Sequence, residues 1–134
     1  MVSIENVAET ALGLPGVSEG TRYGNRTWFV AGKGFVWERP FSKADIKRFG
    51  DASPPAGPII AVATEDLGEK EALLAARPDL FFTIAHFDGF AALLLRLDGL
   101  TTKRLQEVVV DAWLACAPTP VAEEFVASQE KRKR

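Results

Sequence analysis

The sequence predicts an α+β fold, a single two-layer domain in which helices lie on one face of a mostly antiparallel sheet that contains two β-hairpins. Two tight-turn signals, Gly32-Lys33 and Asp88-Gly89, lie between segments rich in apolar residues and predict the hairpins. Several other segments repeat apolar residues at helical spacing. The 134 residues fit one domain, to which we assign residues 1–128, followed by a frayed basic tail at 129–134.

The first fifty residues are expected to form one helix, three strands and a short second helix. Ser3 can cap an amphipathic pattern that ends at the glycines and proline of residues 13–16. Ser42, followed three residues later by Asp45, is a variant of the capping box and predicts the second helix. The expected elements are a helix at 4–12, strands at 18–23, 26–30 and 35–39, and a helix at 42–49.

The first hairpin has a predicted register. With Gly32 as the first residue of a type II′ turn, alternate side chains of the two strands face each other on one side of the sheet. Two tryptophans opposite each other are expected to line the core, and two opposed arginines to diverge into water or to share an anion. This register pairs Val30 with Phe35, Trp28 with Trp37 and Arg26 with Arg39.

The second half of the chain is expected to begin with a loop, because Asp51 to Pro58 is rich in proline and glycine. Asp66 and Glu69 repeat the capping spacing. Asp88-Gly89 suits a type I′ turn, in which both central residues have positive φ. The expected elements are a strand at 59–63, a helix at 67–76, strands at 81–85 and 90–97, a long helix from Thr101 or Thr102 to 116, and a last helix at 119–125.

Several classes of protein are excluded by composition and motif. No apolar run approaches the ~18 residues of a membrane span, and the first residues lack a secretion signal, so we expect a cytoplasmic protein. The single cysteine, Cys116, cannot form an internal disulfide and is expected to be a small buried side chain. The sequence lacks a serine-hydrolase elbow, a phosphate loop and a Cys/His zinc pattern. We therefore expect no catalytic residues, no metal and no cofactor.

His86 is the only histidine, and it admits two interpretations. Together with Asp88 it could act as the oriented base of an enzyme. In the predicted hairpin, however, it lies beside Ile84 and opposite Ala91, at the solvent end of an apolar strand pair. We therefore favour a hydrogen-bonded histidine that fixes the turn.

The net charge of −2 conceals an uneven distribution. Between residues 21 and 50, seven basic residues face two acidic ones, which predicts an electropositive end of the molecule. Cations interleaved with aromatic residues can hold phosphates and stack bases, or can form a solvated surface over an aromatic core. The seven basic residues are Arg22, Arg26, Lys33, Arg39, Lys43, Lys47 and Arg48.

Five segments, in this order and spacing, resemble the MmcQ/YjbR family over roughly Val7 to Phe125. They are Leu14 to Gly20, the strand pair around Gly32 to Phe35, Glu69 to Leu74, His86 to Gly89, and Asp111 to Trp113 with Ala117-Pro118. The resemblance implies a small bacterial cytoplasmic protein with a CyaY-like or secretion-chaperone-like α+β fold. It also implies two β-hairpin wings, proposed in the family to contact DNA, whose tips fall here on Lys33 and on Asp88-Gly89.

We therefore expect a non-enzymatic protein, monomeric or weakly dimeric, that binds the phosphates of duplex DNA with little base readout. The alternative is a protein-binding adaptor or chaperone-like module that uses an exposed patch of Phe29, Phe87 and Phe90. The expected DNA-binding residues are Arg22, Arg26, Lys33, Arg39, Lys43 and Lys47.

Overall fold

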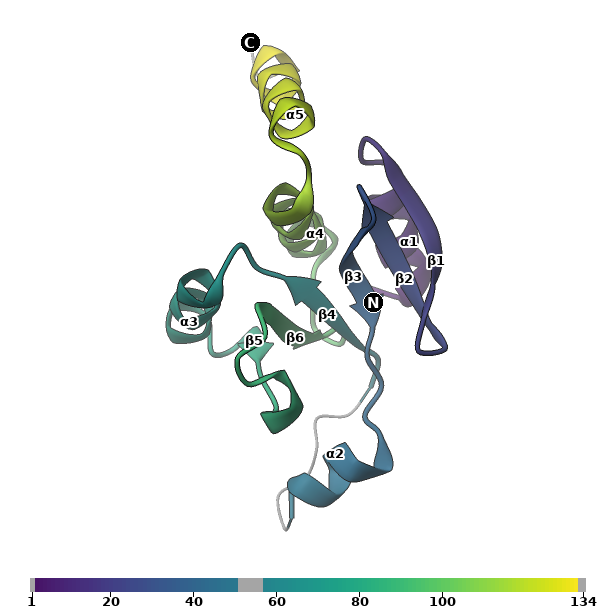
Figure 1. The fold of residues 1–134 in the computed structure, drawn as a ribbon, viewed down its shortest axis with the longest axis vertical. Helices are drawn as coiled ribbons and strands as arrows, with labels where there is room; N and C mark the ends of the chain where they lie inside the picture. Colours follow the sequence, from purple (N-terminus) through teal and green to yellow (C-terminus); the bar gives the residue numbers. More distant parts are fainter. Residues whose placement is uncertain (1, 51–56, 133–134) are drawn as a thin grey trace.

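The computed structural model describes residues 2–50 and 57–132, which form a six-stranded sheet with helices packed against it (Figure 1). Neighbouring strands are antiparallel, in the order β1-β2-β3-β4-β6-β5, so the predicted α+β class is confirmed. The helices are α1 (Ile4–Leu12), α2 (Lys43–Arg48), α3 (Leu67–Ala76), α4 (Thr102–Cys116) and α5 (Thr119–Arg132). The strands are β1 (Val17–Arg22), β2 (Asn25–Val30), β3 (Lys33–Glu38), β4 (Ile59–Ala63), β5 (Phe81–Phe82) and β6 (Ala92–Arg96).

Side-chain caps begin α1, α2, α3 and α4 where the sequence predicts helix starts. Each capping oxygen accepts a hydrogen bond from the backbone N–H three residues later, which satisfies a donor that the helix itself cannot pair. In α1 and α2 the third residue also accepts from the cap, completing a capping box. The capping residues are Ser3, Ser42, Asp66 and Thr101.

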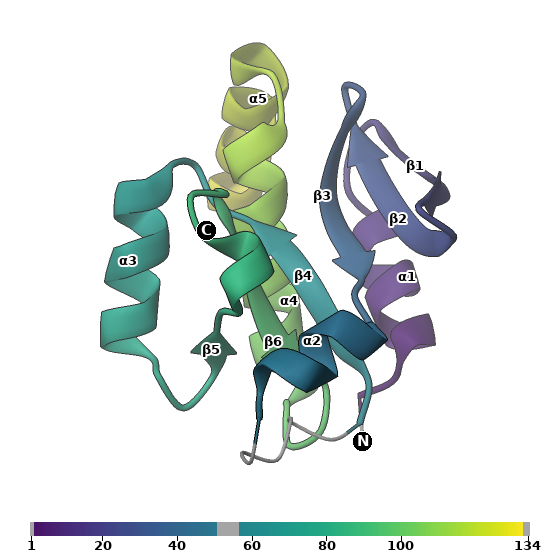
Figure 2. The ribbon, with the colours of Figure 1, turned by 60° about the horizontal axis from the view of Figure 1, so that its bottom comes forward.

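Two hydrophobic clusters lie on opposite faces of the sheet. In β4, Ile60 and Val62 point into the larger cluster beneath α1 and α4, whereas Ile59 and Ala61 point into a smaller one. The predicted helix layer therefore corresponds to α1 and α4. In addition, Phe41 packs on the smaller cluster just before α2, and Figure 2 shows α2 in front of the sheet with α4 behind it. The described residues cover this second face only in part, which leaves room for a site.

The predicted register of the first hairpin is wrong. The β2–β3 turn is Ala31-Gly32, with φ of +51° and +79°, so it begins one residue earlier than expected and has the two positive φ angles of a type I′ turn. A β-bulge then shifts the pairing between Trp28 and Phe29. As a result Trp28 pairs with Val36, and Trp37 lies on the opposite face of the sheet from Trp28.

The second predicted hairpin is longer and looser than its turn signal indicated. β5 has only two residues, and the chain between β5 and β6 contains a 3₁₀ helix at Ala85–Phe87. Asp88 has φ −60° and ψ 130°, while Gly89 has φ +76°, which makes this a type II turn closed by the bond from Phe90 N–H to Phe87 O. Only the glycine needs positive φ in such a turn. The predicted placement of His86 opposite Ala91 is therefore also wrong.

The last helix extends beyond the predicted end at Phe125 and includes residues 129–132 of the expected frayed tail. Phe125 packs on Trp113, with ring centroids 5.0 Å apart, and anchors α5 to the core. Glutamine, glutamate, lysine and arginine are good helix formers, so nothing in the following sequence stops the helix. Figure 1 shows α5 extending away from the sheet. The remaining tail residues, 133–134, and residues 51–56 of the predicted loop lie outside the described residues.

Candidate functional site

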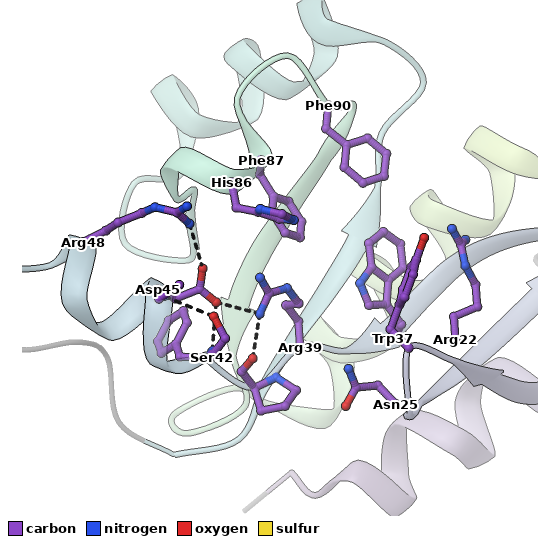
Figure 3. A pocket seen from close by; sticks show the side chains of 14 residues that line it. Arg22, Asn25, Trp37, Arg39, Ser42, Asp45, Arg48, His86, Phe87 and Phe90 are labelled. Carbon is purple, nitrogen blue, oxygen red and sulfur yellow. Dashed lines mark hydrogen bonds and ion pairs between the residues drawn. The ribbon is translucent and has the colours of Figure 1, made fainter.

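An open groove of about 600 Å³ lies on the second face of the sheet. Four parts of the chain border it: the β1–β2 turn, the end of β3, helix α2 and the segment from His86 to Phe90. Figure 3 shows Arg22 and Arg48 on opposite sides, with His86 and Trp37 between them. Segments distant in sequence therefore build one surface from charged and aromatic side chains.

Stacked aromatic rings form one wall of the groove. Trp37 is nearly parallel to Phe90, at 6.1 Å and 24° between planes, and to Phe87, at 6.4 Å and 25°. Phe87 is buried, whereas Phe90 is 49% exposed and Trp37 is half-buried. The β-bulge is what turns Trp37 toward this wall, because without it the indole would point to the core face.

A buried carboxylate organises the opposite wall. Asp45 Oδ2 lies 2.9 Å from Arg39 Nη1 and accepts a hydrogen bond from the Ser42 N–H, also at 2.9 Å. Its other oxygen lies 3.6 Å from Arg48 Nη1. Burial alone would raise the pKa of Asp45, but the hydrogen bonds from Ser42 and Arg39 outweigh it and hold the pKa below its ordinary value. Asp45 thus fixes α2 to the end of β3 and orients Arg48.

Acid is expected to remove the contribution of Asp45 to folding stability. Because its pKa is lower in the folded protein than in the unfolded chain, this contribution is complete above the unfolded value of roughly 3.9 and is lost as the pH falls through the folded value. Urea denaturation of the wild type and of Asp45→Asn measures it, at about pH 6 and about pH 2.5. The difference in free energy of unfolding should shrink at the lower pH, and a constant difference would contradict this prediction.

A buried lysine holds the backbone of the aromatic wall in place. Lys70 of α3 is 6% exposed, and its Nζ donates to the carbonyl oxygens of Phe87 at 2.6 Å and Phe90 at 2.7 Å. Burial lowers the pKa of Lys70, and the charge of Asp88 partly opposes this. The ammonium group therefore fixes the turn from Phe87 to Phe90 to α3.

The predicted DNA-binding residues separate into those at the groove and those away from it. Arg22 and Arg39 line the groove, and Lys43 and Lys47 are exposed on α2. Arg22 is exposed, whereas Arg39 is largely buried against Asp45.

Arg26 and Lys33 lie elsewhere. Arg26 is paired with Glu5 at 2.6 Å and Glu19 at 3.1 Å, and these contacts satisfy its charge. The hydrogen bond from Arg26 also lowers the pKa of Glu19. Lys33 begins β3 and pairs with Val30 of the larger cluster, so its side chain lies on the opposite face of the sheet from the groove.

Most residues of the groove were not among the predicted site residues, and Arg48, Trp37 and Tyr23 are three of these. Arg48 was counted in the basic cluster, and its position in the last turn of a capped helix could have placed it. The wrong hairpin register assigned Trp37 to the core. Nothing in the local sequence distinguished Tyr23, because its importance comes from the turn that it occupies.

The aromatic patch and the histidine proposed from sequence do not assemble as expected. Phe87 is only 2% exposed, so Phe29, Phe87 and Phe90 do not form one exposed patch. His86 is exposed in the groove, and no hydrogen bond of its side chain is found within residues 2–50 and 57–132. The interpretation of His86 as a hydrogen-bonded brace is therefore not supported.

Burial raises the pKa of Cys116, which is half-buried.

Two further structural features bear on the possible chemistry. Within the described part of the chain, no three histidine, cysteine or acidic side chains are grouped to hold a metal ion. None of the helices there is both long and apolar enough to cross a membrane.

Comparison with known proteins identifies the family. The family model described as YjbR matches residues 12–115. The chain is 37% identical over 131 residues to the uncharacterized protein Rv2570 of Mycobacterium tuberculosis and, with the same identity, to the uncharacterized protein Mb2600 of Mycobacterium bovis. Each alignment covers 96% of this chain and 98% of the relative.

A solved structure shares the fold. Protein DR2400 of Deinococcus radiodurans, whose family-model domain is DUF419, matches with a TM-score of 0.59 at 15% identity, covering 85% of this chain and 78% of that one. At this identity the likeness concerns the fold alone. The match of the family model and the relatives aligned over almost their whole length lead to one conclusion: the chain belongs to the YjbR family.

Proposed function

We propose that this chain is a non-enzymatic DNA-binding protein that contacts phosphates at the rim of the groove. The observation that supports the proposal is the gathering of exposed cations on one open face. Arg22 and Arg48 border the groove from opposite sides, and 53% of the Arg48 side chain is exposed despite its contact with Asp45. Guanidinium groups bind phosphate oxygens through charge-assisted hydrogen bonds, and one guanidinium often forms two such bonds in parallel.

Two lysines extend the positive charge beyond the groove. Lys43 and Lys47 are exposed on α2, the helix that also carries Arg48. The acidic residue of that helix is Asp45, and its carboxylate is buried with its own partners. A phosphate chain that leaves the groove along α2 would therefore meet three cations and no exposed carboxylate of that helix.

The proposal differs from the sequence-based one in the surface that touches DNA. Arg26 is neutralised by two carboxylates, and the side chain of Lys33 lies on the opposite face of the sheet. The contact surface we propose is the groove and α2, not the tip of the first hairpin.

Salt dependence tests the proposal. Three or four phosphate contacts predict a slope of log affinity against log salt of about −2 to −4, measured by fluorescence anisotropy of labelled DNA. Arg22→Ala is expected to weaken binding and to reduce the steepness of this slope by about one.

The matched control is Lys33→Ala, which removes one cation from the opposite face of the sheet and should leave both affinity and slope unchanged. Two results would refute the proposal: no binding to DNA at low salt, or equal losses from Arg22→Ala and Lys33→Ala.

A further inference from the structure

We infer that the groove is specific for single-stranded DNA and that an unpaired base stacks on its aromatic rings. This inference rests on the proposed function and adds to it the form of DNA that is recognised. Three side chains carry it: Tyr23, Trp37 and Phe90, which line the groove together.

A tyrosine at position 23 does not contribute to the stability of the fold. It is 94% exposed, so it buries almost no apolar surface. It also has φ of +53° as the first central residue of the type I′ turn Tyr23-Gly24, a position that favours asparagine, aspartate or glycine. Positive φ is unfavourable for a large side chain. A tyrosine there is therefore explained better by a ligand than by stability.

The side chains around Tyr23 are suited to a nucleotide, which combines an aromatic base with a negatively charged phosphate. The Arg22 guanidinium lies 5.8 Å from the centre of the Tyr23 ring, a cation–π distance. Trp37 and Phe90, which line the same groove, stack on each other and keep part of their surface open. The volume of about 600 Å³ is within the roughly 300–1,000 Å³ typical of small-molecule sites, which is sufficient for a nucleotide.

The geometry favours a single strand over a duplex. In a duplex both faces of every base are covered by its neighbours, so aromatic side chains cannot stack on them without unpairing. In a single strand each base offers a free face, and its phosphates can reach cations on either side. Arg22 and Arg48 flank the rings in this way, with Trp37 between them (Figure 3).

The variant Tyr23→Asn separates ligand binding from folding. Asparagine before Gly24 suits a type I′ turn, so the melting temperature should stay unchanged or rise. Loss of one stacked ring should weaken binding of an oligothymidylate strand by about tenfold. Tyr23→Phe, which keeps the ring, should retain the affinity.

The matched control is Ala31→Asn, which makes the same kind of change at the other type I′ turn, Ala31-Gly32. Its melting temperature should likewise stay unchanged or rise, and its affinity should stay unchanged.

Tryptophan fluorescence supplies an independent readout. Trp28 and Trp113 are completely buried, whereas Trp37 lies at the groove, so a stacked base should quench only the Trp37 part of the emission. Quenching is expected with oligothymidylate and not with a duplex of the same length.

The outcomes distinguish this inference from the proposed function. Equal affinity for strand and duplex, or no loss in Tyr23→Asn, overturns the inference and leaves DNA binding intact. Absence of binding to both forms overturns the proposed function as well. A tenfold preference for an oligouridylate strand would overturn the assignment to DNA.

Discussion

Replacing Asp45 by asparagine is expected to lower the free energy of unfolding by roughly 2–4 kcal/mol at neutral pH. Arg39 would lose the carboxylate that balances its charge while 85% of its side chain stays out of water, since its exposed fraction is 15%. The asparagine oxygen can still accept from the Ser42 N–H, so the helix cap is largely kept and the loss reports the charge. Urea denaturation followed by circular dichroism measures the effect.

The control for this substitution is Asp79→Asn. Asp79 pairs with Arg77 at 3.0 Å, but the two side chains are 68% and 37% exposed. Exposed pairs contribute little because water and salt screen them. No measurable change is therefore expected for Asp79→Asn, and equal effects of the two substitutions would show that Asp45 is not the organising group we describe.

Replacing Lys70 by methionine is expected to lower the free energy of unfolding by about 2 kcal/mol and to loosen the aromatic wall. The substitution removes two hydrogen bonds from a charged donor and leaves the Phe87 and Phe90 carbonyls without that partner. Removing a buried ammonium group also removes its desolvation cost, so the net loss is smaller than two charged hydrogen bonds would give alone. Methionine keeps the length of the side chain and its apolar contacts.

Two measurements check the substitution of Lys70. Denaturation gives the stability, and the Trp37 emission maximum reports whether water reaches the wall when the turn loosens. Lys103→Met, on the exposed surface of α4, is the control and should change neither. Unchanged stability and emission in Lys70→Met would contradict the role assigned to this lysine.

Features determined by neighbouring residues could be predicted from the sequence. The caps at Ser42 and Asp66 depend on residues three positions apart, and the structure contains both. Strand β4 was predicted with its exact bounds because an apolar run between turn residues leaves few alternatives.

The hairpin register could not be predicted, because the sequence is compatible with two turn types. Gly32 fits either the first position of a type II′ turn or the second position of a type I′ turn, and the chain adopts the second with Ala31 in an unfavourable conformation. A β-bulge leaves no signal in the alternation of residues. The same ambiguity applies to Asp88-Gly89, where a type II turn needs positive φ only at the glycine.

The charge pattern predicted part of the candidate site. The basic segment does supply Arg22, Arg39 and Arg48 to the groove. It could not show that Arg26 is neutralised, because one of its partners, Glu5, lies 21 residues away in α1. It also could not show that the side chains of Lys33 and Arg22 lie on opposite faces of the sheet, which depends on how the strands are paired.

The β-bulge in β3 makes the aromatic wall depend on strand register as well as on residue identity. If the same residues paired regularly, without the bulge, the indole of Trp37 would point inward and Val36 would face the ligand instead. A slip of one residue in the pairing, with no change in amino-acid sequence, is enough to replace a flat aromatic surface by an aliphatic one.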